Sequence, residues 1–271
     1  MYGGDIISFQ ALSFTYADVP TEIHGLTMTS INGPGESSVS SGSRNTLVTD
    51  RTFRDPVHHL FAIEQSEPLE FEVEITSQTA VDRFDVVVLA NWLTEQDGYQ
   101  KLQIDQDDLK NAYFNCVFTN MSNIYYHNSA YSFRCVVRCD APWAWEWERR
   151  RTYSFKTGSL NTFKFNNTSS SKNMLMPVFD IDLSSNTSSF SLTNKSANNL
   201  IMSFTGLSPG EHIYIDCKNK ILYSFDRPNT YITNKFNKKF LGFIRGYNEI
   251  DVIGNIDNMT IKFQHSLKVG G

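Results

Sequence analysis

Two short clusters, one of acidic side chains and one of histidines, have residue types that could bind a metal ion. The segment DQDDLKNAY (105–113) is dense in carboxylates, but a calcium loop also needs a central glycine and a closing glutamate, and that glycine is absent. His58 and His59 are adjacent, so in a strand their rings would face opposite sides, which suits a single metal poorly. The first cluster is typical of a solvated turn, and neither predicts a metal site.

The cysteines indicate buried thiols. Cys135 and Cys139 lie in YSFRCVVRCD, which alternates as a strand does. Four strand residues span roughly 13 Å, beyond the roughly 7 Å between Cα atoms that a disulfide allows. The spacing also lacks the CxxC pairs of a zinc site. We predict no disulfide between these two cysteines.

Motifs of common enzyme classes do not occur. The chain contains no GxSxG, GxxxxGK[ST], HExxH or GxGxxG sequence. Paired carboxylates for glycoside hydrolysis would be distant in sequence, and nothing points to a particular pair. We therefore predict a protein that is not an enzyme, with no catalytic residues, no cofactor and no metal.

Two aromatic segments suggest carbohydrate contact as an alternative function. In DAPWAWEWERRR (140–151), Trp143, Trp145 and Trp147 share one face if the chain is extended. They could stack on sugar rings, but we favour a structural role with Trp143 in the core. The second candidate for sugar contact is His212, Tyr214 and Asp216, which lie on the strand face opposite the apolar one.

Most of the chain alternates with a period of two residues, which predicts strands. In LEFEVEIT (69–76) the apolar residues take one face, and Glu70, Glu72 and Glu74 take the other. In YSFRCVVRC (131–139) Arg134 and Arg138 share the polar face. These stripes could be two solvated faces, or could pair within one sheet or between subunits. We interpret them as a candidate subunit interface.

One helix is expected after Ala80. Val81, Phe84, Val88 and Trp92 recur at spacings of three and four, which predicts a stripe facing the core. Thr79 is a possible N-cap, and Gly98 provides a permissive residue at the exit.

The second half of the chain is built of short strand patterns separated by turn signals, which predicts a β-sandwich. Residues 1–155 carry 11 basic and 21 acidic residues, whereas residues 156–271 carry 13 and 8. We therefore predict two domains, 1–155 and 156–271.

Targeting and nucleic-acid signals are weak. The N-terminal MYGGDII lacks the charged and apolar regions of a signal peptide, and the apolar run VVVLA is too short to cross a bilayer. The longest basic run is RRR at 149–151. We expect synthesis in a cytoplasm, no membrane insertion and no nucleic-acid recognition.

Several motifs, in order along the chain, resemble the distal tail proteins of long-tailed siphophages. They are IISFQALSF (6–14), IHGLTMTSI (23–31), NWL (91–93), GYQKL (98–102), DLKNAYFNCVF (108–118), FRCVVRCDAPWAW (133–145), SPGEHIYIDCKNKILYS (208–224) and FIRGYNEIDVIGN (243–255). The segment from Gly33 to Pro68 departs from the pattern, because Ser41-Gly42-Ser43-Arg44 stands where many members of that family have a compact Gly-Arg-Gly-like turn.

The resemblance implies a mainly β protein in the virion tail tip. Its N-terminal domain would be a β-sandwich with one α-helix and a hairpin, and its C-terminal domain a galectin-like β-sandwich. Six N-terminal domains would form a ring that joins the tail tube protein to the tail-associated fibre or lysin protein. Receptor-binding proteins could dock outside the ring, and the alternative function is a carbohydrate-binding module for host-wall polysaccharide.

Overall fold

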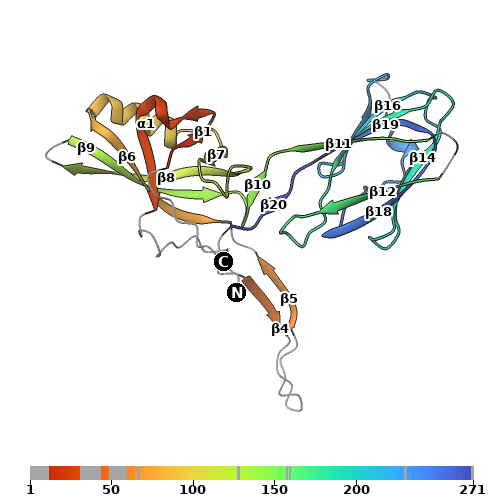
Figure 1. Ribbon diagram of the computed structural model, residues 1–271, viewed down its shortest axis with the longest axis horizontal. Coiled ribbons are helices and arrows are strands. Elements are labelled where there is room, and N and C mark those ends of the chain that lie inside the picture. The colour runs from red at the N-terminus through yellow and green to blue at the C-terminus, as the bar shows by residue number, and fades with distance from the viewer. Residues whose placement is uncertain are drawn as a thin grey trace, which may run out of the picture. The chain divides into compact units, whose positions relative to one another are not determined.

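The computed structural model describes residues 12–30, 44–48, 60–65, 68–126, 129–156, 158, 160–228 and 231–269 (Figure 1). The chain forms two compact units. Met1–Glu146 and Leu267–Gly271 make the first unit, and Trp147–Ser266 make the second. No helix within the described residues combines the length and the hydropathy of a membrane span.

The first unit is built on a nine-stranded sheet. Its main path runs in the order β2-β1-β7-β8-β9-β6-β3, with every neighbouring pair antiparallel. The strands are β1 (Phe14–Tyr16), β2 (Val19–Pro20), β3 (Leu26–Ser30), β6 (Glu70–Val81), β7 (Gln100–Ile104), β8 (Ala112–Tyr126), β9 (Ser129–Cys139), β10 (Ala144–Glu146) and β20 (Ser266–Leu267). A 3-10 helix, η1 (Thr21–His24), links β2 to β3.

A backbone bridge closes this sheet on itself. Leu12, just before β1, donates its N–H to the Met28 carbonyl on β3 and accepts the Met28 N–H, at 3.0 and 2.8 Å. The strand at one end of the order thus meets the segment that leads into β1, so the edge of β3 is partly covered there.

Strict alternation on the central strands produces the core. Leu69, Phe71, Val73 and Ile75 are buried along β6, and so are Phe133, Cys135, Val137 and Cys139 along β9. The intervening glutamates and arginines take the outer face, as the period of two residues predicts. The expected strands are confirmed.

The helix α1 (Arg83–Thr94) lies on one side of the sheet (Figure 1). Its N-cap is Asp82, whose carboxylate accepts the N–H groups of Phe84 and Asp85 at 2.8 and 2.9 Å. Thr79, the cap expected from the sequence, is instead part of β6. Gly98 adopts a φ of +102°, which confirms the need for a permissive residue after the helix.

The buried stripe of α1 is not the predicted one. Phe84 and Val88 are 80% and 55% exposed, so their assignment to the core was wrong. Leu89 and Leu93 are buried instead, with the half-buried Trp92 packed against the same core. Apolar residues occupy both faces of this helix, and the sheet buries the face that carries the leucines.

A separate two-stranded sheet lies within the segment from Gly33 to Pro68. It pairs β4 (Arg44–Val48) with β5 (Leu60–Gln65) in antiparallel register. This is the hairpin expected in the first domain. His58, His59 and the Ser41–Ser43 turn signal lie outside the described residues.

The second unit is a sandwich of two antiparallel sheets. One has the strand order β11-β19-β13-β16-β17, and the other β12-β18-β14-β15. The strands are β11 (Arg149–Ser154), β12 (Asn161–Asn167), β13 (Val178–Leu183), β14 (Phe190–Asn194), β15 (Leu200–Phe204), β16 (His212–Asp216), β17 (Ile221–Ser224), β18 (Gly246–Ile253) and β19 (Ile256–Phe263), with a 3-10 helix η2 (Thr233–Lys235).

The inner faces of these two sheets share one core. Phe179, Ile213 and Ile261 come from one sheet, and Phe165 and Ile250 come from the other. The predicted fold class is confirmed: the part of the chain that the structure describes is mainly β, with α1 as its one α-helix.

The units divide the chain differently from the expected boundary at residue 155. Residues 147–155 belong to the second unit, because β11 pairs with β19 along Arg149–Ser154. At the other end the chain returns to the first unit, where Val269 is buried and Leu267 packs against the core. The distribution of charge along the sequence predicts neither the start of the second unit at residue 147 nor the return of the chain to the first unit.

Candidate functional site

The glutamate and arginine stripes face each other within one protomer. The register of β6 and β9 places Glu70 opposite Arg138 and Glu74 opposite Arg134. The Arg138 Nε lies 2.7 Å from Glu70 Oε2, and the Arg134 Nε lies 3.6 Å from Glu74 Oε2. Glu72 stands opposite Val136.

These pairs change the interpretation of the stripes. Charges that are matched within one sheet need no partner subunit to neutralise them. Exposed pairs of this kind stabilise by about 0–1 kcal/mol. The head-to-tail pairing of stripes between subunits therefore loses its electrostatic motive, and Glu70, Glu74, Arg134 and Arg138 serve their own sheet.

The aromatic side chains near α1 have structural contacts. Trp92 donates its indole N–H to the Tyr16 carbonyl at 3.1 Å, and its ring stacks with that of Phe14 at 6.1 Å. Trp143 is half-buried outside the main core cluster and meets Trp145 edge-on, with centroids 5.8 Å apart. Trp92 thus ties the helix to the sheet while remaining half-buried, and Trp143, which was also expected in the core, is only partly shielded from water.

The four cysteines are buried and free. Burial raises the pKa of Cys135 and of Cys217 to about 12. It also raises the pKa values of Cys116 and Cys139, which stand opposite each other on β8 and β9. At neutral pH these thiols are protonated, as packing residues are.

Within the acid-dense segment at 105–113, residues 107–111 form a turn, and β8 begins at Ala112. Asp107 pairs with Lys110, and hydrogen bonding to that ammonium group lowers the pKa of the carboxyl. Among the described residues, no group of three or more histidine, cysteine or acidic side chains could hold a metal ion.

His212 and Tyr214 lie on the outer face of the β11-β19-β13-β16-β17 sheet. Their neighbours Ile213 and Ile215 point into the core, so alternation places both side chains away from it. Asp216 is buried and accepts two hydrogen bonds from Asn219, at 2.9 Å from the backbone N–H and 2.8 Å from the side chain. Asp216 therefore holds the β16–β17 turn rather than a ligand.

The structure adds two aromatic residues to this face. Tyr223 on β17 stands opposite Tyr214 and stacks on it at 4.8 Å, and Phe225 meets Tyr223 edge-on at 5.1 Å. The alternation of ILYSF could have placed both rings on one face. Only the hairpin brings them beside Tyr214.

A polar row borders the rings. His212 Nε2 contacts Asp180 Oδ1, and His212 Nδ1 lies 3.7 Å from Asp182 Oδ1. Lys262 places its Nζ 3.6 Å from Asp180 Oδ2 and 5.9 Å from the centre of the Tyr214 ring. Partial burial, followed by the charge of Asp216, raises the pKa of Tyr214.

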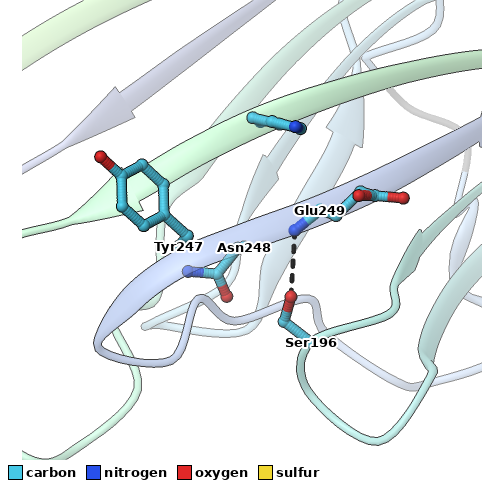
Figure 2. A pocket seen from close by; sticks show the side chains of 5 residues that line it. Ser196, Tyr247, Asn248 and Glu249 are labelled. Atoms are coloured by element: carbon cyan, nitrogen blue, oxygen red, sulfur yellow. Dashed lines mark hydrogen bonds between the residues drawn. The ribbon is translucent and has the colours of Figure 1, made fainter.

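A cavity of about 400 Å³ opens on the other sheet of the sandwich, lined by Lys164, Ser196, Tyr247, Asn248 and Glu249. Figure 2 shows the Ser196 hydroxyl accepting the Glu249 N–H, at 3.1 Å. The Tyr247 ring is 78% exposed. Lys195 lies 2.9 Å from Glu249 and 2.9 Å from Asp251, and hydrogen bonding to it lowers the pKa of Asp251.

Comparison with known proteins identifies a family for each part of the chain. Residues 9–141 match the family described as phage tail protein N-terminal domain, and residues 143–263 match the phage tail C-terminal domain. No curated protein matches the sequence.

Among the solved structures that share the fold, two illustrate the likeness. The first is the Dit protein (gp 19.1) of SPP1, described as a paradigm of the hub adsorption apparatus in phages that infect Gram-positive bacteria. Its TM-score is 0.66 at 7% identity, over 94% of this chain and 99% of that one. The second comes from the phage p2 baseplate in its activated, strontium-bound conformation, with a TM-score of 0.52 at 8% identity over 96% and 100% of the two chains. With both domain models matched in order and almost the whole length sharing the Dit fold, the chain belongs to the phage tail proteins.

Proposed function

We propose that this protein is a distal tail protein that forms a six-membered ring at the tail tip of a long-tailed phage. One combined observation supports the proposal. Both tail-protein domain families match the chain in order, and nearly its whole length shares the fold of one hub protein. The ring would join the tail tube protein to the tail-associated fibre or lysin protein. Receptor-binding proteins would dock around it, and its role would be structural, without catalysis.

The exposed face of α1 supports self-association. Phe84, Val87 and Val88 lie on one side of the helix at spacings of three and four, and all three are exposed. Adjacent apolar side chains that remain in water mark a surface that a partner covers. A neighbouring copy in the ring is the partner that we assign to this face.

The charge of the first unit limits what could hold neighbouring copies together. Its outer sheet face carries both signs, and the Glu70–Arg138 and Glu74–Arg134 pairs neutralise each other locally. These pairs leave the excess of acidic residues in the first unit unchanged, so contact between copies must outweigh that repulsion. Apolar contact would carry most of the affinity, since exposed ion pairs contribute little.

The experiment measures the mass of the full chain by size exclusion with light scattering, followed by negative-stain imaging. We expect the mass of six copies and rings with a central channel. Phe84→Glu should reduce the mass to that of a monomer, because a carboxylate cannot be buried in an apolar contact without a large cost. The matched control is Tyr231→Glu, which alters an exposed ring on the second unit and should leave the mass unchanged.

Two outcomes would count against these ideas. A monomer at high micromolar concentration contradicts the ring. If the Phe84→Glu variant still forms the ring, the proposal of a hub stands, but α1 is not part of the interface between copies.

A further inference from the structure

The outer face of the second unit's five-stranded sheet has an unusual composition for a surface in water. Tyr223 and Phe225 are 37% and 46% exposed, and with Tyr214 they form one contiguous group of rings. His212 adds a fourth ring, 4.2 Å from Phe225. Four rings linked by successive contacts on a solvated strand face are more than the sandwich needs, since its core is filled from the opposite face.

The polar groups beside these rings are held in place by one another. The chain of contacts runs from Lys262 to Asp180, from Asp180 to His212, and from His212 towards Asp182. Asp226 fixes the start of β16 by accepting the His212 N–H at 2.7 Å. A set of donors and acceptors that is already oriented loses little conformational entropy when a ligand replaces water.

This combination specifies the chemistry of the ligand. Ring faces pack against the C–H faces of a sugar, and carboxylates and an imidazole bind hydroxyl groups in either direction. Three carboxylates, on Asp180, Asp182 and Asp226, outnumber the ammonium of Lys262 in this polar row, and Arg150 on the next strand is paired with Glu148, so a polyanion would be repelled. A neutral chain of sugars offers C–H faces and hydroxyl groups and carries no negative charge, so it fits this face.

We propose that the β16–β17 face, defined by Tyr214, Tyr223, Phe225, His212 and Asp180, binds a neutral saccharide. This gives the second unit an adhesive activity of its own, which does not depend on whether the first unit forms a ring. A host-wall polysaccharide would supply such chains. Repetition of the site in an assembled ring would strengthen weak individual binding through multivalency.

The cavity on the other sheet is the competing location. It presents one aromatic ring, Tyr247, and its acidic residue Glu249 is already paired with Lys195. Asn248 at its base is buried in backbone and amide hydrogen bonds. That cavity has the size of a ligand site, but it lacks the several contiguous rings and the pre-oriented carboxylates of the β16–β17 face.

The test titrates the full chain with neutral oligosaccharides of glucose, galactose and N-acetylglucosamine, and with the anionic polymer polyglycerol phosphate. Binding is followed by calorimetry and by shifts in tyrosine fluorescence. We expect at least one neutral oligosaccharide to bind at millimolar concentration or below, and the phosphate polymer not to bind. Tyr223→Ala should weaken binding about tenfold, the effect of one lost aromatic contact.

Tyr247→Ala is the matched control, because it removes an exposed tyrosine from the opposite sheet and should leave the affinity unchanged. Thermal unfolding of each variant verifies that the sandwich is intact, and Phe225→Ala serves if Tyr223→Ala unfolds. The proposal is overturned if no neutral oligosaccharide binds, if the phosphate polymer binds in its place, or if Tyr247→Ala abolishes binding while Tyr223→Ala does not. Light scattering on the same samples reports the ring separately, so the two proposals fail independently.

Discussion

At the scale of the residue, Asn248 shows how one side chain can join several segments. It is buried on β18, and its Oδ1 accepts hydrogen bonds from Asn194 Nδ2 and from the Ile244 N–H, both at 2.9 Å. Its Nδ2 donates to the carbonyls of Ile244 and Gly246, at 2.8 and 3.0 Å. An amide is required here because the site needs a donor and an acceptor on one planar group.

We predict that Asn248→Ala lowers the free energy of unfolding by about 2–3 kcal/mol, because buried partners of the amide remain without a hydrogen bond. The control is Asn237→Ala, whose exposed amide also makes two hydrogen bonds but can exchange them for water. We expect Asn237→Ala to lower the free energy of unfolding by less than about 1 kcal/mol. Urea denaturation measures both values, and equal losses would contradict the role of burial.

At the scale of the element, the rotation of α1 about its axis decides which apolar residues are buried. Leu89 and Leu93 face the sheet, and Trp92 reaches the Tyr16 carbonyl from the same side. Phe84 and Val88 face away. An apolar stripe on a helix thus marks either a core or a contact with a partner, and the packing of the sheet distinguishes the two.

The burial of Leu93 can be tested by truncation. Leu93→Ala should destabilise the first unit by about 2–5 kcal/mol, the range for leucine in a packed core. Phe84→Ala should change stability by only about 0.5 kcal/mol, when both are measured at a concentration where light scattering shows a monomer. A larger loss for Phe84→Ala would place that ring in the core after all.

The turn between β18 and β19 depends on a glycine. Gly254 has a φ of +105°, and a Cβ atom there would lie 2.6 Å from the Ser189 carbonyl oxygen. Gly206 also has a positive φ, of +71°, but no heavy atom lies within 4 Å of its Cβ position. Substitutions at the two positions therefore distinguish the cost of backbone strain from the added cost of a steric clash.

We therefore expect Gly254→Ala to lower the free energy of unfolding by about 3 kcal/mol, from strain and overpacking together. Gly206→Ala should cost about 1 kcal/mol from strain alone. Thermal or urea unfolding of the two variants measures the difference. Losses of the same size would mean that the chain near Ser189 moves aside easily.

At the scale of the whole molecule, the two units are not simply consecutive in the sequence. β11 supplies an edge strand to the second unit, although it precedes the expected boundary at 155. The last described residues, around Val269, complete the core of the first unit. The second unit is thus inserted between two segments of the first.

This arrangement predicts how fragments behave. A fragment of residues 147–266 should fold as an independent sandwich with one cooperative transition. A fragment of residues 156–271 lacks β11 and exposes the edge of β19, so it should melt at a lower temperature and aggregate more readily. Calorimetry of both fragments gives the comparison, and equal melting temperatures would show that β11 adds little.

The sequence by itself determined the mainly β class, most of the strands of the second unit and which face of β6 and β9 is buried. Alternation is a local property, and it persists wherever one face of a strand meets a core. The order of motifs along the chain also pointed to a phage tail protein before the fold was known. Gly98 belongs with these successes, because its conformational requirement is local.

Only the tertiary structure determines which residues are neighbours across strands and between distant segments of the chain. Because both faces of α1 are apolar, periodicity could not choose between Phe84 and Leu89, and only the sheet settles that choice. The pairing of Glu70 with Arg138, and of Tyr214 with Tyr223, follows from strand neighbours that no local pattern encodes. The same holds for the return of Val269 to the first core, since contacts between residues distant in sequence form only when the whole unit folds.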